Sequence, residues 1–269
     1  MLEMRNVRKT FQAGTPNEQP GLVGVSLRVE RGDFLTVVGS NGAGKTTLFN
    51  AVAGIFPVDG GSVFLDGEDI TYRKEHVRAK NIGRLFQDPK TGTAPGLTVE
   101  ENLALVYSKA TGRFPLRLAL RASDRRHFRE VLSGLDMGFE NRLGAKVGLL
   151  SGGQRQALTL LIATLVPPKL LLLDEHTAAL DPVAAAKVME LTAQICRRSG
   201  ITTLMITHNV GAALTTGSRT IMMDRGKIVM DLSGKERENM TPRDLFLRYR
   251  ETTRKELDND RMLFSEEEA

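Results

Sequence analysis

Short apolar runs alternate with stretches of helical spacing along the chain, and this pattern predicts an α/β protein. From residue 2 the apolar and polar positions alternate as in strands, for example over Val25–Val29, and they lead into the continuous apolar run Phe34–Val38. A continuous run of this kind is typical of a strand buried on both faces. Further strands are predicted over residues 60–67, 82–86, 170–173 and 201–207, and a hairpin over 221–230.

Helical spacing of apolar residues predicts the helices of the chain. They are expected over residues 48–53, 72–80, 98–108, 124–135, 155–166, 182–198 and 242–251. Thr98 and Glu101 have the spacing of a capping box, and Asp181 followed by Pro182 is a typical helix start. Because strand patterns are missing between residues 88 and 150, we expect this part of the sequence to form an inserted helical lobe.

Composition excludes several classes of protein. With 41 % hydrophobic and 26 % charged residues among 269, the chain is typical of a globular protein. A single cysteine, Cys196, excludes an internal disulfide framework and suits a reducing compartment. The longest apolar run, residues 157–166, is too short to cross a bilayer, and the first residues lack the apolar segment of a signal peptide. We therefore expect a cytosolic protein unless a partner holds it at a membrane.

The predicted lobe carries a run of basic residues with two interpretations. Its members are Lys109, Arg113, Arg117, Arg121, Arg125, Arg126 and Arg129. Such a run most often forms a solvated face, and the alternative is a face turned toward acidic lipid headgroups. The net charge of +5 is compatible with both and with nucleic acid. Because the chain has no tryptophan and only 5 % aromatic residues, it offers little for bases to stack on, and we expect no nucleic-acid partner.

A glycine-rich segment lies between the apolar strand 34–38 and the helix 48–53. Glycines let the backbone curl so that successive N–H groups point at one anion, and the following helix presents its positive end to the same anion. In such a loop Lys45 reaches the β- and γ-phosphates of a nucleotide, and the Thr46 hydroxyl binds Mg²⁺. The alternative of a plain glycine-rich turn does not explain the strand and helix that flank it. The segment is Gly39-Ser40-Asn41-Gly42-Ala43-Gly44-Lys45-Thr46-Thr47.

Polar residues at the ends of other elements are further candidates. Asp174 and Glu175 follow four leucines, at the strand end where open α/β sheets bind ligands. Carboxylates there are costly unless they are paired or bind a metal. Residues 151–154 open a helix and form either a second anion-binding surface or a simple cap. His208 is a candidate site residue or a capping or core residue, and Phe11 is a candidate or a core residue.

Together these residues resemble the ATP-binding subunits of ABC transporters over nearly the whole chain. The cradle segment 39–47 is similar to the Walker A motif, and residues 170–175 are similar to the Walker B motif with its following glutamate. Phe86-Gln87-Asp88 resembles the Q-loop, residues 150–154 the signature motif, residues 179–181 the D-loop, and His208 the switch histidine. Each of the smaller motifs is weak alone, but their order along the chain is specific to the family.

The resemblance implies a fold and a domain division. It implies an ABC ATPase fold of the P-loop NTPase type, with a mostly parallel RecA-like core sheet, an N-terminal antiparallel β subdomain and an inserted α-helical subdomain. The ATP-binding core is expected over 1–87 and 156–250, the helical subdomain with the signature over 88–155, and a frayed tail over 251–269.

The resemblance also implies the site residues. Glu175 is expected to polarise the attacking water and His208 to contact the γ-phosphate, with Lys45 and Gln87 as the other catalytic residues. Mg²⁺ is expected at Thr46, Gln87 and Asp174, and the adenine of ATP on Phe11. The signature residues and Asp181 are expected to close the ATP site of a second copy, because one chain's lobe holds its signature away from its own cradle. These second-copy residues are Ser151, Gly152, Gly153, Gln154 and Asp181.

The expected partners follow from the same resemblance. They are a membrane permease, a second ABC subunit in a homodimer, and, through the permease, a substrate-binding protein, with the chain at the cytoplasmic face of the membrane. Residues 174–181 and 92–98 resemble one branch, the ATPases of tryptophan/tyrosine-type uptake systems. His176 departs from the proline that the family usually has there, so the local turn is expected to differ and a titratable group is expected beside the attacking water.

Two other functions compete with the transporter subunit. The first is an ABC-type ATPase that acts on ribosomes or DNA. Translation factors of the family carry two cassettes in one chain and repair proteins a long coiled coil, whereas this sequence has one cassette and no sustained heptads. The second is a regulatory module without turnover, against which the presence of Glu175, His208 and the signature argues. The transporter subunit is therefore the favoured function.

Overall fold

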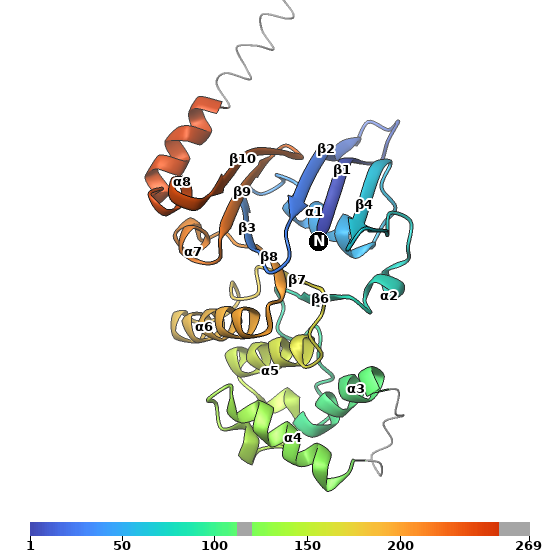
Figure 1. Cartoon of the computed structure of the whole chain (residues 1–269), viewed down its shortest axis with the longest axis vertical. Helices are drawn as coiled ribbons and strands as arrows, with labels where there is room; N and C mark the ends of the chain where they lie inside the picture. Colours follow the sequence, from blue (N-terminus) through green and yellow to red (C-terminus); the bar gives the residue numbers. More distant parts are fainter. Residues whose placement is uncertain (112–119, 253–269) are drawn as a thin grey trace, which may run out of the picture. The chain divides into compact units, whose positions relative to one another are not determined.

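The computed structural model describes residues 1–111 and 120–252 and forms two compact units (Figure 1). Unit 1 contains Met1–Arg73 and the chain from Met205 to residue 252, and unit 2 contains Lys74–Leu204 as far as described. These units are defined by compactness, whereas the predicted subdomains are defined by function. The boundaries of the functional subdomains remain a prediction. Most of the predicted tail, 253–269, lies outside the described residues.

The first sheet of unit 1 is antiparallel, with strand order β2-β1-β4-β5. Its strands are β1 (Leu2–Phe11), β2 (Gln19–Val29), β4 (Gly60–Leu65) and β5 (Glu68–Asp69). Val25, Leu27 and Val29 are buried, whereas Ser26 and Arg28 between them are exposed. This alternation buries one face of the strand and is the pattern that predicted it.

A second group of strands in unit 1 leads into the cradle segment. It consists of β3 (Phe34–Gly39), β9 (Arg219–Asp224) and β10 (Lys227–Ser233). β3 pairs in parallel with β9, and β9 forms the predicted hairpin with β10. The amide of Thr207 donates to the carbonyl of Val37 at 3.2 Å, so the chain that enters unit 1 after β8 (Thr202–Ile206) lies beside β3.

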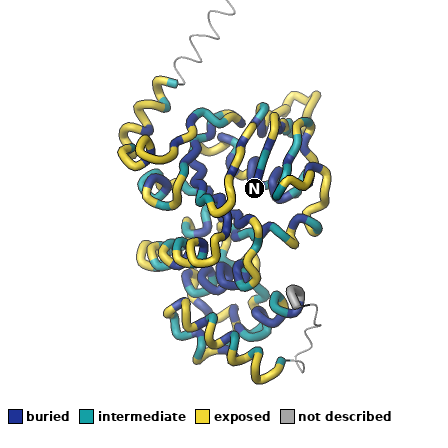
Figure 2. Tube along the Cα trace, in the orientation of Figure 1, coloured by how far each residue is buried: buried dark blue, intermediate teal, exposed yellow. Residues whose placement is uncertain are grey.

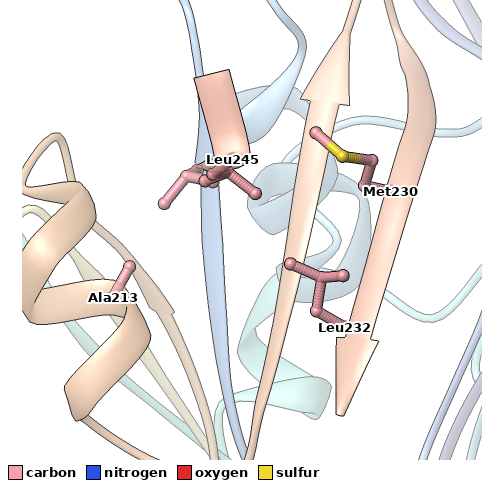
Figure 3. Close-up of a cluster of buried hydrophobic side chains, with 5 residues drawn as sticks. Ala213, Met230, Leu232 and Leu245 are labelled. Atoms are coloured by element: carbon pink, nitrogen blue, oxygen red, sulfur yellow. The ribbon is translucent and has the colours of Figure 1, made fainter. Parts of the chain in front are cut away.

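Four helices complete the described part of unit 1, and one apolar cluster packs several of these elements together. The helices are α1 (Lys45–Ala53), α7 (Val210–Thr215), α8 (Gly234–Glu238) and a helix over 242–252. In Figure 3, Leu245 of the last helix lies near Ala213 of α7 and near Met230 and Leu232 of β10. Val38 of β3 belongs to the same cluster. The last helix is therefore held to the core strands by burial of apolar surface.

Unit 2 combines parallel strands with helices. Its elements include α2 (Glu75–Arg78), β6 (Ile82–Leu85), α3 (Val99–Thr111), α4 (Ala122–Ser133), α5 (Gly152–Thr164), β7 (Leu170–Asp174) and α6 (Pro182–Ser199). Two 3₁₀ turns, over residues 139–141 and 147–149, precede α5. β6 and β7 pair in parallel. The predicted capping box at the start of α3 is present, since Thr98 and Glu101 exchange backbone-to-side-chain hydrogen bonds.

Helices α5 and α6 of unit 2 differ in burial, which Figure 2 shows as a mostly dark α5 and a largely exposed outer face of α6. Ala157, Leu158 and Leu160 of α5 are fully buried. In α6 the buried residues Val188, Leu191 and Thr192 lie on one face. A helix that is apolar nearly all round belongs in an interior, whereas an amphipathic helix covers a surface.

The basic run of the predicted lobe is only partly described. Arg113 and Arg117 lie outside the described residues, as does the side chain of Lys109. Arg125 forms an ion pair with Glu100, with Nε 2.9 Å from Oε2. The positive charge of this member of the basic run is therefore balanced by a carboxylate. Within residues 1–111 and 120–252, no helix is both long and apolar enough to span a membrane.

Candidate functional site

The cradle segment adopts the curled backbone that its glycines predict. Gly39, Gly42 and Gly44 have φ of 149°, 81° and 99°, which glycine adopts far more readily than other residues. At two of these positions there is also no room for a side chain. A Cβ on Gly39 would lie 2.3 Å from the carbonyl oxygen of Met223, and one on Gly44 would lie 2.6 Å from that of Gly21.

Lys45 closes the loop from inside. It is the first residue of α1, and its ammonium donates to the carbonyls of Gly39 at 2.8 Å and Ser40 at 2.9 Å. The side chain is buried, while Asn41 and Thr46 are exposed. The structure thus brings together the loop, the helix start and the lysine that the sequence predicted, and leaves the outer residues of the loop accessible.

Two glycines outside the motif support the cradle. The amide of Gly226, in the β9–β10 turn, donates to the carbonyl of Ala43 at 3.0 Å. Gly21 of β2 packs so closely against the loop that its own Cβ would lie 2.9 Å from the methyl carbon of Thr47. Sequence reasoning did not identify either residue as part of the site. The turn Asp224-Arg225-Gly226 was visible in the sequence, but its contact with the cradle depends on the fold.

Phe11 lies beside the start of α1. A Cβ on Gly21 would meet the ring of Phe11 at 2.6 Å as well as Thr47, so the ring and the cradle helix share one surface. The ring makes an edge contact with Phe56, with centroids 5.3 Å apart, and the ammonium of Lys9 lies 5.7 Å from its centroid. Phe11 is half-buried. This placement agrees with both of the roles considered for it.

His208 follows β8 in unit 1 and is exposed. The residue before it, Thr207, is hydrogen-bonded to β3, and the residue after it, Asn209, caps α7 by accepting from the amide of Ala212 at 2.9 Å. His208 is therefore neither the cap nor a core residue. It lies in the segment that follows a strand beside β3, which itself leads into the cradle.

Asp174 is the last residue of β7 in unit 2, and Glu175 follows it. Both are half-buried, and Glu175 has φ of 49°, so the chain turns sharply after the strand. The carboxylate of Asp174 contacts Arg84 of β6, with Oδ2 3.3 Å from Nη2. Sequence reasoning missed Arg84. A single charged residue inside the otherwise apolar segment 82–86 was the available signal, because a buried charge requires a partner.

His176 is an interior residue, and it does not add a titratable group at the surface. It is 2 % exposed, and its Nε2 lies 3.1 Å from the hydroxyl of Thr192 in α6. Burial lowers the pKa of His176 from 6.5 to about 4, because the apolar interior disfavours the charged form. The imidazole is therefore neutral at physiological pH.

The signature segment, residues 150–154, and the D-loop, residues 179–181, lead into two helices of unit 2 whose first turns pack together. Ser151 and Gln154 form a capping box at the start of α5, with Ser151 and Gly152 exposed. Asp181 caps α6 by accepting from the amides of Val183 at 3.2 Å and Ala184 at 3.0 Å. A Cβ on Gly153 would lie 2.6 Å from the Cβ of Ala184, so glycine is needed where the two helix starts meet.

The predicted site residues thus form two groups. The cradle, Phe11 and His208 belong to unit 1, and Gln87, Asp174, Glu175, the signature residues and Asp181 belong to unit 2. Gln87 is exposed directly after Phe86, whose carbonyl accepts from the side chain of Gln156 in α5 at 3.3 Å.

The oxygen ligands of these groups suit Mg²⁺ and not a protein-only metal cage. Across the part of the chain that the structure describes, no three residues of His, Cys, Asp or Glu gather in a metal-binding cluster. Mg²⁺ is usually bound through one or two protein oxygens together with substrate phosphates and water. Asp174 already holds a cationic group, the guanidinium of Arg84, which fits a carboxylate placed for a cation.

Comparison with known proteins tests the family resemblance. The sequence profile of the ABC transporter family matches residues 22–178. The chain is 41 % identical over 251 residues to the tyrosine transport ATP-binding protein of Clostridioides difficile (strain R20291). The aligned residues cover 93 % of this chain and 98 % of that protein. It is 32 % identical to the methionine import ATP-binding protein MetN of Mannheimia succiniciproducens, over 85 % of this chain and 64 % of that one.

Solved structures agree. The dimeric post-hydrolysis state of the ATP-binding cassette MJ0796 with ADP and Pi has a TM-score of 0.71 and 27 % identity, covering 87 % of this chain and 98 % of that one. The ADP conformation of the cassette MJ1267 has a TM-score of 0.72 and 26 % identity, covering 93 % of this chain and 98 % of that one. The predicted ABC ATPase fold is confirmed, with its antiparallel N-terminal sheet and parallel core strands. This chain belongs to the ABC transporter family, as an ATP-binding subunit.

Proposed function

We propose that this chain is the ATP-hydrolysing subunit that powers import of a small molecule, specifically an amino acid. The observation that carries this proposal is its 41 % identity, over nearly the full length of both chains, to a tyrosine transport ATP-binding protein. A methionine import ATP-binding protein is a more distant relative. The partners are then a membrane permease and, through it, a substrate-binding protein, with the chain at the cytoplasmic face of the membrane.

The cradle binds the phosphates of ATP in this proposal. The exposed residues Ser40, Asn41 and Gly42 offer their backbone N–H groups, and α1 offers its N-terminal N–H groups and the positive end of its dipole. Lys45 now donates to two loop carbonyls, and it exchanges these for the β- and γ-phosphates. Thr47 belongs to the same helix start, and Phe11 beside it stacks on adenine.

Mg²⁺ is held by the hydroxyl of Thr46 and by the oxygens of Gln87 and Asp174. When bound, Mg²⁺ supplies positive charge that offsets the charge developing on the transferred phosphoryl group. The protein's own contribution is mainly to position the phosphates and the water, since phosphoryl transfer needs little covalent help. The exposure of Thr46 and Gln87 supports this assignment, because both side chains are accessible to a ligand.

Glu175 accepts a proton from the attacking water, or polarises it, and His208 contacts the γ-phosphate. The sharp turn at Glu175 supports this role, because it directs the chain away from the strand right after Asp174. A general base of this kind contributes about 10²–10⁴-fold to the rate. Loss of the carboxylate, with its shape retained, is then expected to stop turnover and leave ATP binding intact.

Two copies of the chain complete each ATP site. Ser151, Gly152, Gly153 and Gln154 of one copy face the nucleotide of the other, and Asp181 lies beside them across the same interface. A two-fold axis makes this contact twice and creates two equivalent sites. The support is that Ser151 and Gly152 are exposed at a helix N-terminus, and that a structural relative, MJ0796, forms a dimer with ADP and Pi.

The test is the variant Glu175→Gln, measured in an ATPase assay and by size-exclusion chromatography with light scattering, with and without ATP. We expect hydrolysis to fall at least a hundredfold and an ATP-dependent dimer to accumulate. Glu190→Gln is the matched control, because Glu190 is exposed on α6 and its carboxylate contacts Gln194 at 3.0 Å and Lys187 at 3.9 Å on the same helix. Normal turnover in Glu175→Gln would refute the role of Glu175. Absence of any dimer with ATP would refute the composite site.

A further inference from the structure

Arg84 and Asp174 form a partly buried ion pair on neighbouring strands of unit 2. Nη2 of Arg84 lies 3.3 Å from Oδ2 of Asp174, and both side chains are 14 % exposed. Arg84 stands opposite Leu172 in the parallel pairing of β6 with β7. Because side chains alternate along a strand, Arg84 shares a face of these strands with Leu172 and Asp174.

The guanidinium is held at this position by packing more than by hydrogen bonds. Its Cζ lies 4.7 Å from the centre of the Phe86 ring. The carbonyl of Phe86 in turn accepts from Nε2 of Gln156, on the helix that begins with the signature residues. Nε of Arg84 is buried and finds no hydrogen-bond partner within residues 1–111 and 120–252. Its contact with Asp174 is also a single bond and not the two-pronged pair that Arg and carboxylates form at their strongest.

We propose that Arg84 is a positioning residue for the metal-binding carboxylate: it neutralises Asp174 when no divalent cation is bound and weakens the binding of that cation. The proposal rests on the proposed role of Asp174 as a metal ligand. A carboxylate at this depth is costly without a positive partner, so some cation has to be present in both states. Arg84 contributes positive charge beside this carboxylate when nucleotide and metal are absent.

Two effects both predict that loss of Arg84 increases the affinity for the divalent cation. Without its arginine, Asp174 loses the positive charge that Arg84 contributes in the metal-free chain, so binding a divalent cation relieves a larger penalty. The cation also no longer meets a positive charge that contacts the same carboxylate. Arg84→Met, which keeps an unbranched apolar stem and removes the charge, should therefore bind the cation more tightly. The expected gain is roughly three- to thirtyfold, the range between an exposed and a partly buried charge pair.

The experiment measures Mn²⁺ binding by electron paramagnetic resonance at one fixed concentration of ADP, which avoids turnover. The thermal midpoint of each variant is recorded with and without Mn²⁺ and ADP. Arg84→Met should show a lower Mn²⁺ dissociation constant, a lower midpoint without ligands and a larger rise when both are added. Arg84→Lys, which keeps the charge, should stay close to the unmodified chain. Arg84→Gln removes the charge but keeps an N–H donor, and it must shift in the direction of Arg84→Met even if the methionine variant folds poorly.

Arg219→Met is the matched control, because Arg219 also pairs with an aspartate, with Nε 2.7 Å from Oδ1 of Asp231, but lies in unit 1 away from β6 and β7 in sequence. Its Mn²⁺ affinity should not change. Equal or weaker Mn²⁺ binding in both Arg84→Met and Arg84→Gln would overturn the proposal while leaving Asp174 as a ligand. If Asp174→Asn binds Mn²⁺ and ADP as well as the unmodified chain does, the metal role of Asp174 fails, and this proposal fails with it.

Discussion

The ring nitrogen Nε2 of His176 lies 3.1 Å from the hydroxyl of Thr192, and that hydroxyl donates to the carbonyl of Val188 at 2.7 Å. Since a hydroxyl has one proton, Thr192 accepts from His176, and the neutral imidazole carries its proton on Nε2. This contact ties the turn after Glu175 to the interior face of α6. Where the family usually has a proline, this chain has a buried hydrogen bond.

Thr192→Val should destabilise the protein although it barely changes the side chain's shape. The N–H of His176 would lose its acceptor in a fully buried place, which costs about 1–3 kcal/mol. Thr192→Ser keeps the hydroxyl and removes one methyl group, so its loss should be smaller. The midpoint of urea unfolding measures both. A serine variant that is destabilised more than the valine variant would show that packing, not the hydrogen bond, matters here.

The stability of the chain should depend on the protonation of His176 in the acid range. Its folded pKa is about 4 and its ordinary value 6.5. Below pH 6.5 the unfolded chain therefore takes up a proton that the folded chain refuses. The neutral, buried imidazole does not lower the free energy of unfolding above pH 6.5. As pH falls from 6.5 to about 4, the free energy of unfolding decreases by roughly 3 kcal/mol in total.

The check is a comparison of two pH profiles of the urea midpoint, measured without nucleotide and metal. His176→Gln does not titrate, so its profile should be flatter between pH 6.5 and 4 than that of the unmodified chain. Carboxylates titrate in both proteins and cancel in the difference. Parallel profiles would mean that His176 is accessible to protons in the folded state.

The sequence pattern predicted the long elements correctly and missed or misjudged the short ones. The strands that enter the cradle and end at Asp174 appear as expected, because continuous apolar runs leave few alternatives. α7 and α8 were not predicted, since helices of six and five residues carry too little periodicity. α2 is limited to Glu75–Arg78, shorter than the predicted 72–80, and Tyr72 is exposed outside it.

The cradle could be predicted because all its determinants are adjacent in sequence. The residues that support it could not, because they come from distant strands. Gly21 and Gly226 reach the loop only because the fold brings β2 and the β9–β10 turn beside it, and no local pattern marks either glycine as a neighbour of the loop. Arg84 meets Asp174, ninety positions away, by strand pairing.

Gly44→Ala should impair nucleotide binding beyond the strain of its backbone. Gly44 has φ of 99°, and a Cβ there would lie 2.6 Å from the carbonyl oxygen of Gly21 and 3.1 Å from Cα of Gly226. Backbone atoms cannot turn away as a side chain can, so the loop has to move. We expect at least a tenfold loss of affinity for a fluorescent ATP analogue, together with a lower thermal midpoint.

Gly32→Ala separates the two costs of that change. Gly32 has φ of 82°, but a Cβ on it would meet nothing within 4 Å. Its substitution should cost only the left-handed backbone penalty, about 1–2 kcal/mol, and leave affinity for the analogue unchanged. Equal affinities for Gly44→Ala and Gly32→Ala would show that the cradle tolerates the displacement.

Phe11→Ala decides between the two roles that the sequence left open for this aromatic ring. If the ring stacks on adenine, its removal should weaken binding of a fluorescent ATP analogue roughly 5- to 150-fold, since stacking of a base on an aromatic ring is worth about 1–3 kcal/mol. Binding of tripolyphosphate, which has no base, should stay the same because it uses the cradle alone. Phe11→Tyr keeps a ring and should restore the analogue's affinity. If Phe11 is instead a packing residue, its loss disturbs Gly21 and Thr47, which share its surface, and both ligands weaken together.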